Sequence, residues 1–246
     1  MTSAEFSDLL RRAEAGEAEA ELRLGLCHSR GEGVPRDEAA AARWFAAAAA
    51  QGERRAQCAL GVCHAKGTGV AQDHALAARW FRAAALQGDR RAAFNLAVLI
   101  QTGHVPEAAP GEAAAWLRHA AVAGLPDAQL RFGVDLLATA GSAPEKQEAA
   151  AWVFNAAQTG LAAAQYQLAL LFDTGEGAGR DPLLAIEWYE LAAAQGHAGA
   201  KYNLGGHYEH GHEGLEPDPA RAEQLYREAA AAGHAAAAEA LRALQC

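Results

Sequence analysis

The chain has 246 residues, 51% of them apolar, and a formal net charge of −9 from 21 basic and 30 acidic side chains. This charge opposes nonspecific attraction to nucleic acid or to an anionic membrane, so we expect neither as a partner. The sequence contains no apolar run long enough for a transmembrane helix, and the charged start MTSAEFSDLLRRAEAG does not look like a signal peptide. The four cysteines form no CxxC pair, which is typical of a reducing compartment. We therefore expect a cytoplasmic protein, and the lysine-poor, alanine-rich composition favours a bacterial source.

The tryptophans reveal a repeat. All five of them stand 36 residues apart, at Trp44, Trp80, Trp116, Trp152 and Trp188. Each begins a stretch such as WFRAAALQG that ends at a glycine, and a sixth copy begins 37 residues later at Leu225. One spacing shared by every tryptophan indicates a tandem array, not chance.

Glycines mark the ends of the repeats. Each alanine-rich run ends at one of Gly16, Gly52, Gly88, Gly124, Gly160, Gly196 and Gly233. Because glycine tolerates the left-handed conformation in which helices often end, each glycine is predicted to follow the second helix of a repeat. The predicted organisation is one domain over residues 1–246. It has a capping helix in 1–16, repeats at 17–52, 53–88, 89–124, 125–160, 161–196 and 197–233, and a second capping helix in 234–246.

The second repeat shows the plan of a helical hairpin. Its first helix is predicted over 53–66, the turn GTGV breaks it, and Asp73 caps a second helix that runs to about Leu86. The first helix carries Gly61, and every counterpart of Gly61 is glycine or alanine: Gly25, Ala97, Gly133, Ala169 and Gly205. We expect the tryptophan of the second helix to pack into the space that this small residue leaves. The third and fourth repeats lack the G-x-G turn, so the middle turns should be less regular.

These positions together resemble the Sel1-like repeat, a relative of the tetratricopeptide hairpin. The second repeat matches the family pattern at Ala56, Leu60, Gly61, Gly67, Gly69, Val70, Asp73, Ala77, Trp80, Ala83, Ala84, Gln87 and Gly88. The resemblance covers nearly the whole chain. It implies an all-α, right-handed α-solenoid of helix–turn–helix repeats whose concave surface is lined by the first helix of each repeat. It also implies an adaptor that assembles protein complexes.

The sequence offers little for catalysis. The four serines lie in no G-x-S-x-G or S-x-x-K motif, and no P-loop is present. The adjacent pairs Cys27-His28 and Cys63-His64 point about 100° apart on a helix and should not work together. We expect the histidines to occupy the aromatic position of the repeat, with a ring nitrogen hydrogen-bonded in the core. No catalytic residue, no cofactor and no enzymatic activity are predicted.

A histidine-rich turn is the one candidate metal site. His207, His210 and His212 are close in sequence, but they do not match the H-E-x-x-H zinc motif. A solvated loop is the expected interpretation, and zinc binding is the alternative.

A partner is expected on the first helices, where residues vary between repeats while the packing positions do not. The predicted groove residues are Arg23, Arg55, Arg91, Asn95, Leu99, Arg131, Asp135, Gln167, Leu171, Asn203 and His207. Four of them are arginines from the first four repeats, which suggests a positive strip that takes an acidic extended segment. The leucines should add apolar contact area.

The predicted function is a monomeric scaffold that binds a peptide or protein segment. Two alternatives stay open. One is a small-ligand-binding or hydrolytic protein like some cysteine-rich relatives, whose regularly paired cysteines are absent here. The other is a dedicated regulator of one enzyme or toxin.

Overall fold

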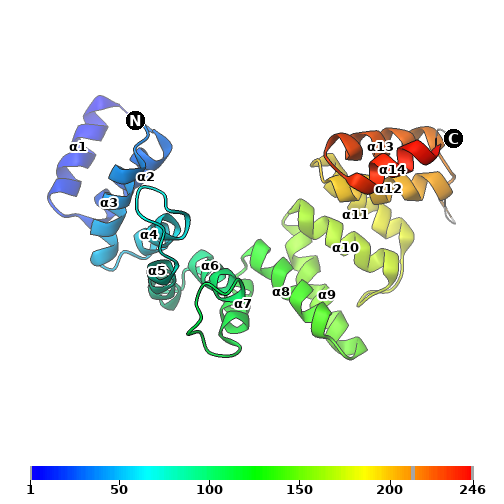
Figure 1. Ribbon diagram of the computed structural model, residues 1–246, viewed down its shortest axis with the longest axis horizontal. Coiled ribbons are helices and arrows are strands. Elements are labelled where there is room, and N and C mark those ends of the chain that lie inside the picture. Colours follow the sequence, from blue (N-terminus) through cyan, green and yellow to red (C-terminus); the bar gives the residue numbers. More distant parts are fainter. Residues whose placement is uncertain (1, 212–213, 245–246) are drawn as a thin grey trace. The chain divides into compact units, whose positions relative to one another are not determined.

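The computed structural model describes residues 2–211 and 214–244, and every regular element within these ranges is an α-helix (Figure 1). The helices are α1 (Ser3–Glu14), α2 (Ala18–Arg30), α3 (Glu38–Ala50), α4 (Arg54–Lys66), α5 (His74–Leu86), α6 (Arg90–Gln101), α7 (Glu112–Val122), α8 (Pro126–Thr139), α9 (Ala143–Gln158), α10 (Ala162–Thr174), α11 (Pro182–Ala194), α12 (Ala198–His210), α13 (Pro219–Ala231) and α14 (Ala235–Leu244). The all-α prediction is confirmed. The chain forms two compact units, Met1–Gly124 and Leu125–Cys246.

Consecutive helices pair into hairpins within each unit. In the N-terminal unit α2 packs on α3, α4 on α5 and α6 on α7, and each hairpin stacks on the next through α3 and α4 or α5 and α6. In the C-terminal unit the pairs are α8 with α9, α10 with α11 and α12 with α13. Helix α1 covers α2, and α14 covers α13. The stacked hairpins confirm the solenoid architecture, whereas the single domain with six repeats and two caps stays a prediction.

The glycines that follow the second helices have the predicted conformation. From Gly16 to Gly233, all seven have φ between +75° and +88°. Such values strain any residue with a side chain, so glycine is the residue that lets the chain turn into the next hairpin.

The residue that packs against the small position is not the tryptophan, and this part of the prediction is wrong. A Cβ on Gly61 would lie 2.6 Å from the ring of Phe81, the residue after Trp80. Its counterparts are equally buried: Phe45, Leu117, Val153, Tyr189 and Tyr226. Trp80 is half-buried and packs against a core cluster with members from α2, α3 and α4. Neighbouring residues on a helix point about 100° apart. Phe81 therefore faces α4 of its own hairpin, and Trp80 faces the neighbouring hairpin.

Buried polar side chains join the repeats. Gln57 is 7% exposed, and its Oε1 accepts a hydrogen bond of 2.8 Å from Nε2 of Gln87. Gln87 also donates to the Gly52 carbonyl at 3.2 Å. The fifth repeat copies this arrangement, because Gln195 donates to Gln165 at 2.7 Å and to the Gly160 carbonyl at 2.9 Å. In these two repeats the glutamine before the helix-ending glycine therefore satisfies a buried polar group of the first helix.

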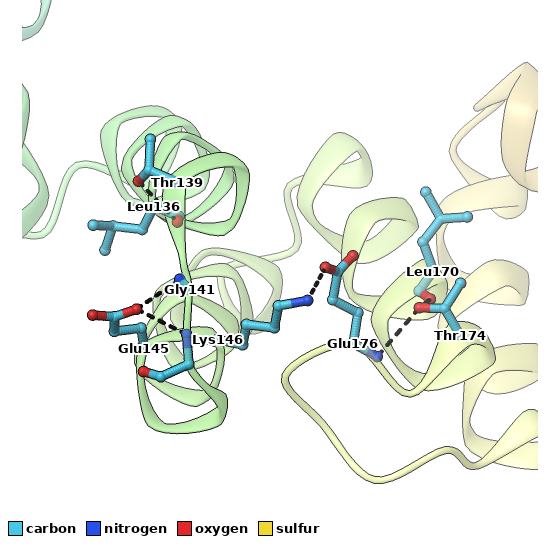
Figure 2. Close-up of polar contacts among 9 residues, drawn as sticks. Leu136, Thr139, Gly141, Glu145, Lys146, Leu170, Thr174 and Glu176 are labelled. Carbon is cyan, nitrogen blue, oxygen red and sulfur yellow. Dashed lines mark hydrogen bonds and ion pairs between the residues drawn. The ribbon is translucent and has the colours of Figure 1, made fainter.

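The G-x-G turns rest on the hairpin before them. Gly69 has φ +71°, and a Cβ there would lie 2.0 Å from the Glu38 carbonyl oxygen at the start of α3. In the same way, a Cβ on Gly177 would lie 2.3 Å from the Lys146 carbonyl oxygen. Next to it, Lys146 Nζ forms an ion pair of 2.9 Å with Glu176 of the turn (Figure 2). Only a residue without a side chain allows this approach.

The middle turns are irregular, as expected. Residues 102–111 join α6 to α7 and bury Val105, which is 3% exposed. Residues 140–142 alone join α8 to α9. There Glu145 Oε2 accepts hydrogen bonds from the backbone N–H groups of Gly141 and Ser142, at 2.7 and 3.0 Å (Figure 2).

Histidines cap two helices of the C-terminal unit. His197 Nδ1 accepts a hydrogen bond of 3.1 Å from the Ala200 N–H, and the ring stacks on Tyr166 at 4.4 Å. His234 caps α14 in the same way and stacks on Tyr202. Burial, together with the charge of His234, lowers the pKa of His197. A neutral ring is required, because Nδ1 accepts a hydrogen bond only when it carries no proton.

The first prediction tests the close contact between α12 and α13. A Cβ on Gly205 would lie 2.7 Å from the ring of Tyr226, whereas one on Gly206 has only the Tyr226 hydroxyl at 3.7 Å. Gly205→Val should lower the free energy of unfolding by about 1–3 kcal/mol, since the buried ring has to move. Gly206→Val, the matched control one residue along, should change it by less than about 0.5 kcal/mol. Urea unfolding followed by circular dichroism measures both, and equal effects at the two positions would contradict this packing.

The second prediction concerns the histidine cap. Because the folded pKa of His197 lies below the unfolded value of about 6.5, the unfolded chain takes up this proton first as the pH falls. His197 therefore destabilises the fold as the pH drops through that value. His197→Asp keeps an acceptor that stays ionised down to a pH of about 4 and should lose less stability in acid.

The measurement is the urea midpoint of each protein at a pH of about 7.5 and of about 5.5. The other histidines titrate in both proteins, so only the difference between the two midpoint losses reports on residue 197. An equal loss in the variant would show that the cap does not respond to protons.

Candidate partner-binding grooves

Nothing in the described part of the chain forms a group of three or more metal-ligating side chains. His207 is 6% exposed, and its Nε2 lies 3.2 Å from Oδ2 of Asp173. His210 Nδ1 lies 3.0 Å from the carbonyl of Gly206. His212, the third residue of the candidate zinc turn, lies outside the described residues.

The cysteines are poor nucleophiles. Cys27, Cys58 and Cys63 are free thiols. Burial raises the pKa of all three, and that of Cys58 reaches about 12, with the nearby Asp89 as a further cause. Because the thiolate is the reactive form, these side chains are inert at neutral pH.

The histidines that follow Cys27 and Cys63 do not form the expected hydrogen bond through Nδ1. The Nδ1 atoms of His28 and His64 are buried and have no hydrogen-bond partner among the described residues. The expected hydrogen bond is therefore not formed by Nδ1 of either ring.

The predicted groove residues divide by exposure. Arg23, Arg55, Arg91 and Arg131 are exposed, and Asn95, Asp135, Gln167 and Asn203 are half-buried. Leu99, Leu171 and His207 are 8%, 2% and 6% exposed, so they offer a partner very little surface. Arg131 pairs with Asp135 on its own helix at 3.1 Å, which lowers its value for an external carboxylate. The arginines that the structure brings together are those of the N-terminal unit.

A first groove, with a volume of about 870 Å³, lies along α1, α2 and α4. Its charged walls are balanced: Arg12, Arg23, Arg30 and Arg55 stand with Glu5, Asp8, Glu19 and Glu32. Several of these charges pair with one another, as Arg55 does with Glu19 at 3.7 Å. This groove therefore has no preference for ligands of either charge.

The neighbouring groove is positive. It has a volume of about 620 Å³ and crosses α2, α4 and α6, and we call it the basic groove. Its five cations are Arg30, Arg36, Arg55, Lys66 and Arg91, and its two acids are Glu38 and Asp89. Both acids are engaged, since Asp89 accepts from the Ala92 N–H at the start of α6 and Glu38 pairs with Arg36. Three of the cations are engaged as well, because Arg30 pairs with Glu32, Arg36 with Glu38 and Arg55 with Glu19. Lys66 and Arg91 have no ion-pair partner within the described ranges.

The sequence predicts only part of the basic groove. Arg55, Arg91 and Asn95 are among the predicted groove residues, whereas Arg30, Arg36 and Lys66 are not. Arg30 and Lys66 stand 36 residues apart, each as the last residue of a first helix, so the repeat spacing contained this signal. Arg36 belongs to a turn, where the spacing does not define the path of the chain.

A third cavity lies in the C-terminal unit. We call it the acidic pocket. Its volume is about 460 Å³, and it is lined by Asp173, Tyr202, Asn203, Gly206, His207, Glu209, His210, Tyr226 and Ala240. It has two carboxylates and no lysine or arginine in its walls. The two units thus carry cavities of opposite charge.

One further finding concerns the membrane. Within the part of the chain that the structure describes, no helix is both long enough and apolar enough to span a bilayer.

Solved structures show what the chain is similar to. A Sel1 repeat protein from Oxalobacter formigenes is 31% identical, with a TM-score of 0.79 over 89% of each chain. The Escherichia coli protein c5321, described as a protective antigen of uropathogenic strains with an SLR fold, is 26% identical with a TM-score of 0.52, over 97% of this chain and 66% of that one. The immunity protein PA5088 from Pseudomonas aeruginosa, 20% identical with a TM-score of 0.54 over 87% of this chain and 82% of that one, shares the fold alone. No curated protein sequence matched.

The family comparison agrees with the helical hairpins. The Sel1 repeat profile matches residues 18–53, 54–89, 90–124, 162–197 and 198–234, and so leaves out the fourth hairpin with its short connection. These matches cover well over half of the chain, and the same hairpins stack in the structure. The chain therefore belongs to the Sel1 repeat family.

Proposed function

We propose that this chain is a non-enzymatic interaction scaffold whose basic groove binds an extended, acidic segment of a partner protein. Sel1 repeat proteins generally mediate protein–protein interaction. The observation that supports the groove is its charge. Five cations against two acids line it, in a chain whose net charge is −9, and two of these cations, Lys66 and Arg91, have no ion-pair partner among the described residues.

The basic groove also offers apolar contact. Leu26, Ala59 and Val62 are half-buried between the cations. A partner segment that alternates acidic and apolar side chains would pair with the cations and cover these residues. Arginine suits such a partner, because its guanidinium binds a carboxylate through two parallel hydrogen bonds. Leu99 and Leu171 are left out of the proposed surface because they belong to the core.

The chemistry of the groove supports binding more than reaction. Cys58 and Cys63 are its only thiols, and burial raises the pKa of both. Ser29 is its only serine, and no histidine lines it. A hydrolytic role would need an activated nucleophile beside a general base.

The test is a selection of random peptides by the whole protein. Selected peptides should be enriched in aspartate and glutamate, and their affinity should fall with added salt because the groove is open to solvent. Arg55→Glu with Arg91→Glu changes the groove from five cations and two acids to three cations and four acids. This variant should bind the selected peptides at least about tenfold more weakly, which corresponds to about 1.4 kcal/mol.

The matched control is Arg43→Glu with Arg79→Glu. These two arginines are exposed on the second helices α3 and α5, do not line the groove, and change the net charge by the same amount. The control should bind like the original protein. Selection of peptides without acidic enrichment, or equal losses in both double variants, would refute the proposal.

A further inference from the structure

The acidic pocket of the C-terminal unit has a different chemistry from the basic groove. Its walls come from α10, α12, α13 and α14, so four helices of one unit shape it. Asp173 and Glu209 supply carboxylates, Asn203 supplies an amide oxygen, and no lysine or arginine lines the cavity to neutralise them. Two carboxylates without a lysine or arginine beside them make the cavity negative, which favours a positively charged ligand.

Contacts with two buried side chains hold the carboxylate of Asp173 in place. His207 is only 6% exposed, and its Nε2 lies 3.2 Å from Oδ2 of Asp173. The hydroxyl of the fully buried Tyr189 donates to the same oxygen at 3.4 Å, and Asn203 Nδ2 donates to that hydroxyl at 3.0 Å. Burial raises the pKa of Tyr189, so its hydroxyl keeps the proton that it donates. These contacts use Oδ2 of Asp173 and orient the rest of the group.

Glu209 is held in a similar way. The hydroxyl of Tyr226 donates to its Oε2 at 2.6 Å. Burial, and then this hydrogen bond, raises the pKa of Tyr226, so the phenol keeps its proton and stays the donor. Both acids of the pocket therefore use one named oxygen for a protein contact, while a carboxylate has about four lone-pair sites in all.

From this arrangement we infer that the acidic pocket receives a cationic side chain, lysine or arginine, of a partner protein. The ammonium or guanidinium group can donate further hydrogen bonds to the two carboxylates and to the Asn203 amide oxygen. The half-buried ring of Tyr202 in the wall gives the aliphatic part of the side chain an apolar surface. The volume of about 460 Å³ is ample for one such side chain. A bound metal fits less well, because His207 already uses its Nε2 for Asp173.

The inference does not depend on the basic groove, since the two cavities lie in different units. It adds a second anchor of opposite charge to a scaffold that binds acidic segments. If the arginine double variant showed no loss of peptide binding, the proposal for the basic groove would fail and the inference about the acidic pocket would still stand. A failure of the probe titration would likewise leave the proposal for the basic groove standing.

The experiment uses the whole chain and small probes. N-acetyl-arginine amide and N-acetyl-lysine amide are titrated into the isotope-labelled protein, and amide shifts of residues around the pocket are followed by NMR. At least one probe should bind with a dissociation constant of roughly millimolar order, as expected for a single side chain. N-acetyl-citrulline amide, which has nearly the shape of the arginine probe and no charge, should bind at least about threefold more weakly.

The matched variants separate the pocket from general charge. Glu209→Gln removes the charge but keeps an oxygen that accepts from Tyr226, so the fold should persist, and the cationic probes should bind at least about threefold more weakly. Glu187→Gln removes an exposed acid of α11 outside the pocket and should bind them as before. The inference is overturned if neither cationic probe shifts pocket residues, if citrulline binds equally well, or if the two variants lose affinity alike.

Discussion

This molecule depends on the close contact between a glycine in the first helix of a hairpin and an aromatic ring in the second helix. Phe81 occupies the space that a side chain on Gly61 would fill, and Phe45 does the same at Gly25. Two helix backbones can approach this closely only where one of them has glycine or alanine. The contact fixes how the two helices of a hairpin cross. Because Trp80 lies one residue before Phe81 on α5, the same contact turns the tryptophan toward the neighbouring hairpin. One helix therefore takes part in both the hairpin and its stacking.

Polar contacts then set the register between hairpins. Gln87 reaches both Gln57 of its own repeat and the carbonyl of Gly52 that ends the repeat before. Gln57 is buried, and its Nε2 donates to the Ala49 carbonyl of the repeat before at 3.4 Å. A shift in the stack would leave this amide unsatisfied at a cost of about 1–3 kcal/mol. The apolar contacts tolerate small displacements, whereas this chain of amides does not. With packing and register assigned to these positions, the exposed residues of the first helices are left to vary.

The sequence predicts the helices and their ends well because these depend on local chemistry. The left-handed glycines and the aspartate caps, such as Asp73 on α5, lie where the spacing puts them. The partner of Gly61 was missed because a helical face spans about 100°, so periodicity does not separate Trp80 from Phe81. For the same reason Leu99 and Leu171 were assigned to the surface, although both are buried and Leu171 belongs to a core cluster with α9 of the hairpin before it. Arg36 entered the basic groove through a turn whose path depends on tertiary contacts, as at Gly69 and Glu38.

The repeat also constrains what the basic groove can bind. Four of its five cations come in pairs one repeat apart, Arg55 with Arg91 and Arg30 with Lys66, on first helices that follow one another in the stack. Packed helices are about 8–10 Å apart, and an extended chain advances about 3.3 Å per residue. An extended partner that crosses these helices therefore meets a new cation about every third residue. A helical partner, which rises about 1.5 Å per residue, would need six or so residues for the same step, close to two turns.

Side chains three residues apart on an extended segment point to opposite faces, so the chain has to twist or bend to present them all to the groove. A segment with some freedom to adjust its backbone meets this demand better than a rigid strand, and for this reason the groove suits an acidic stretch that takes its final conformation on binding.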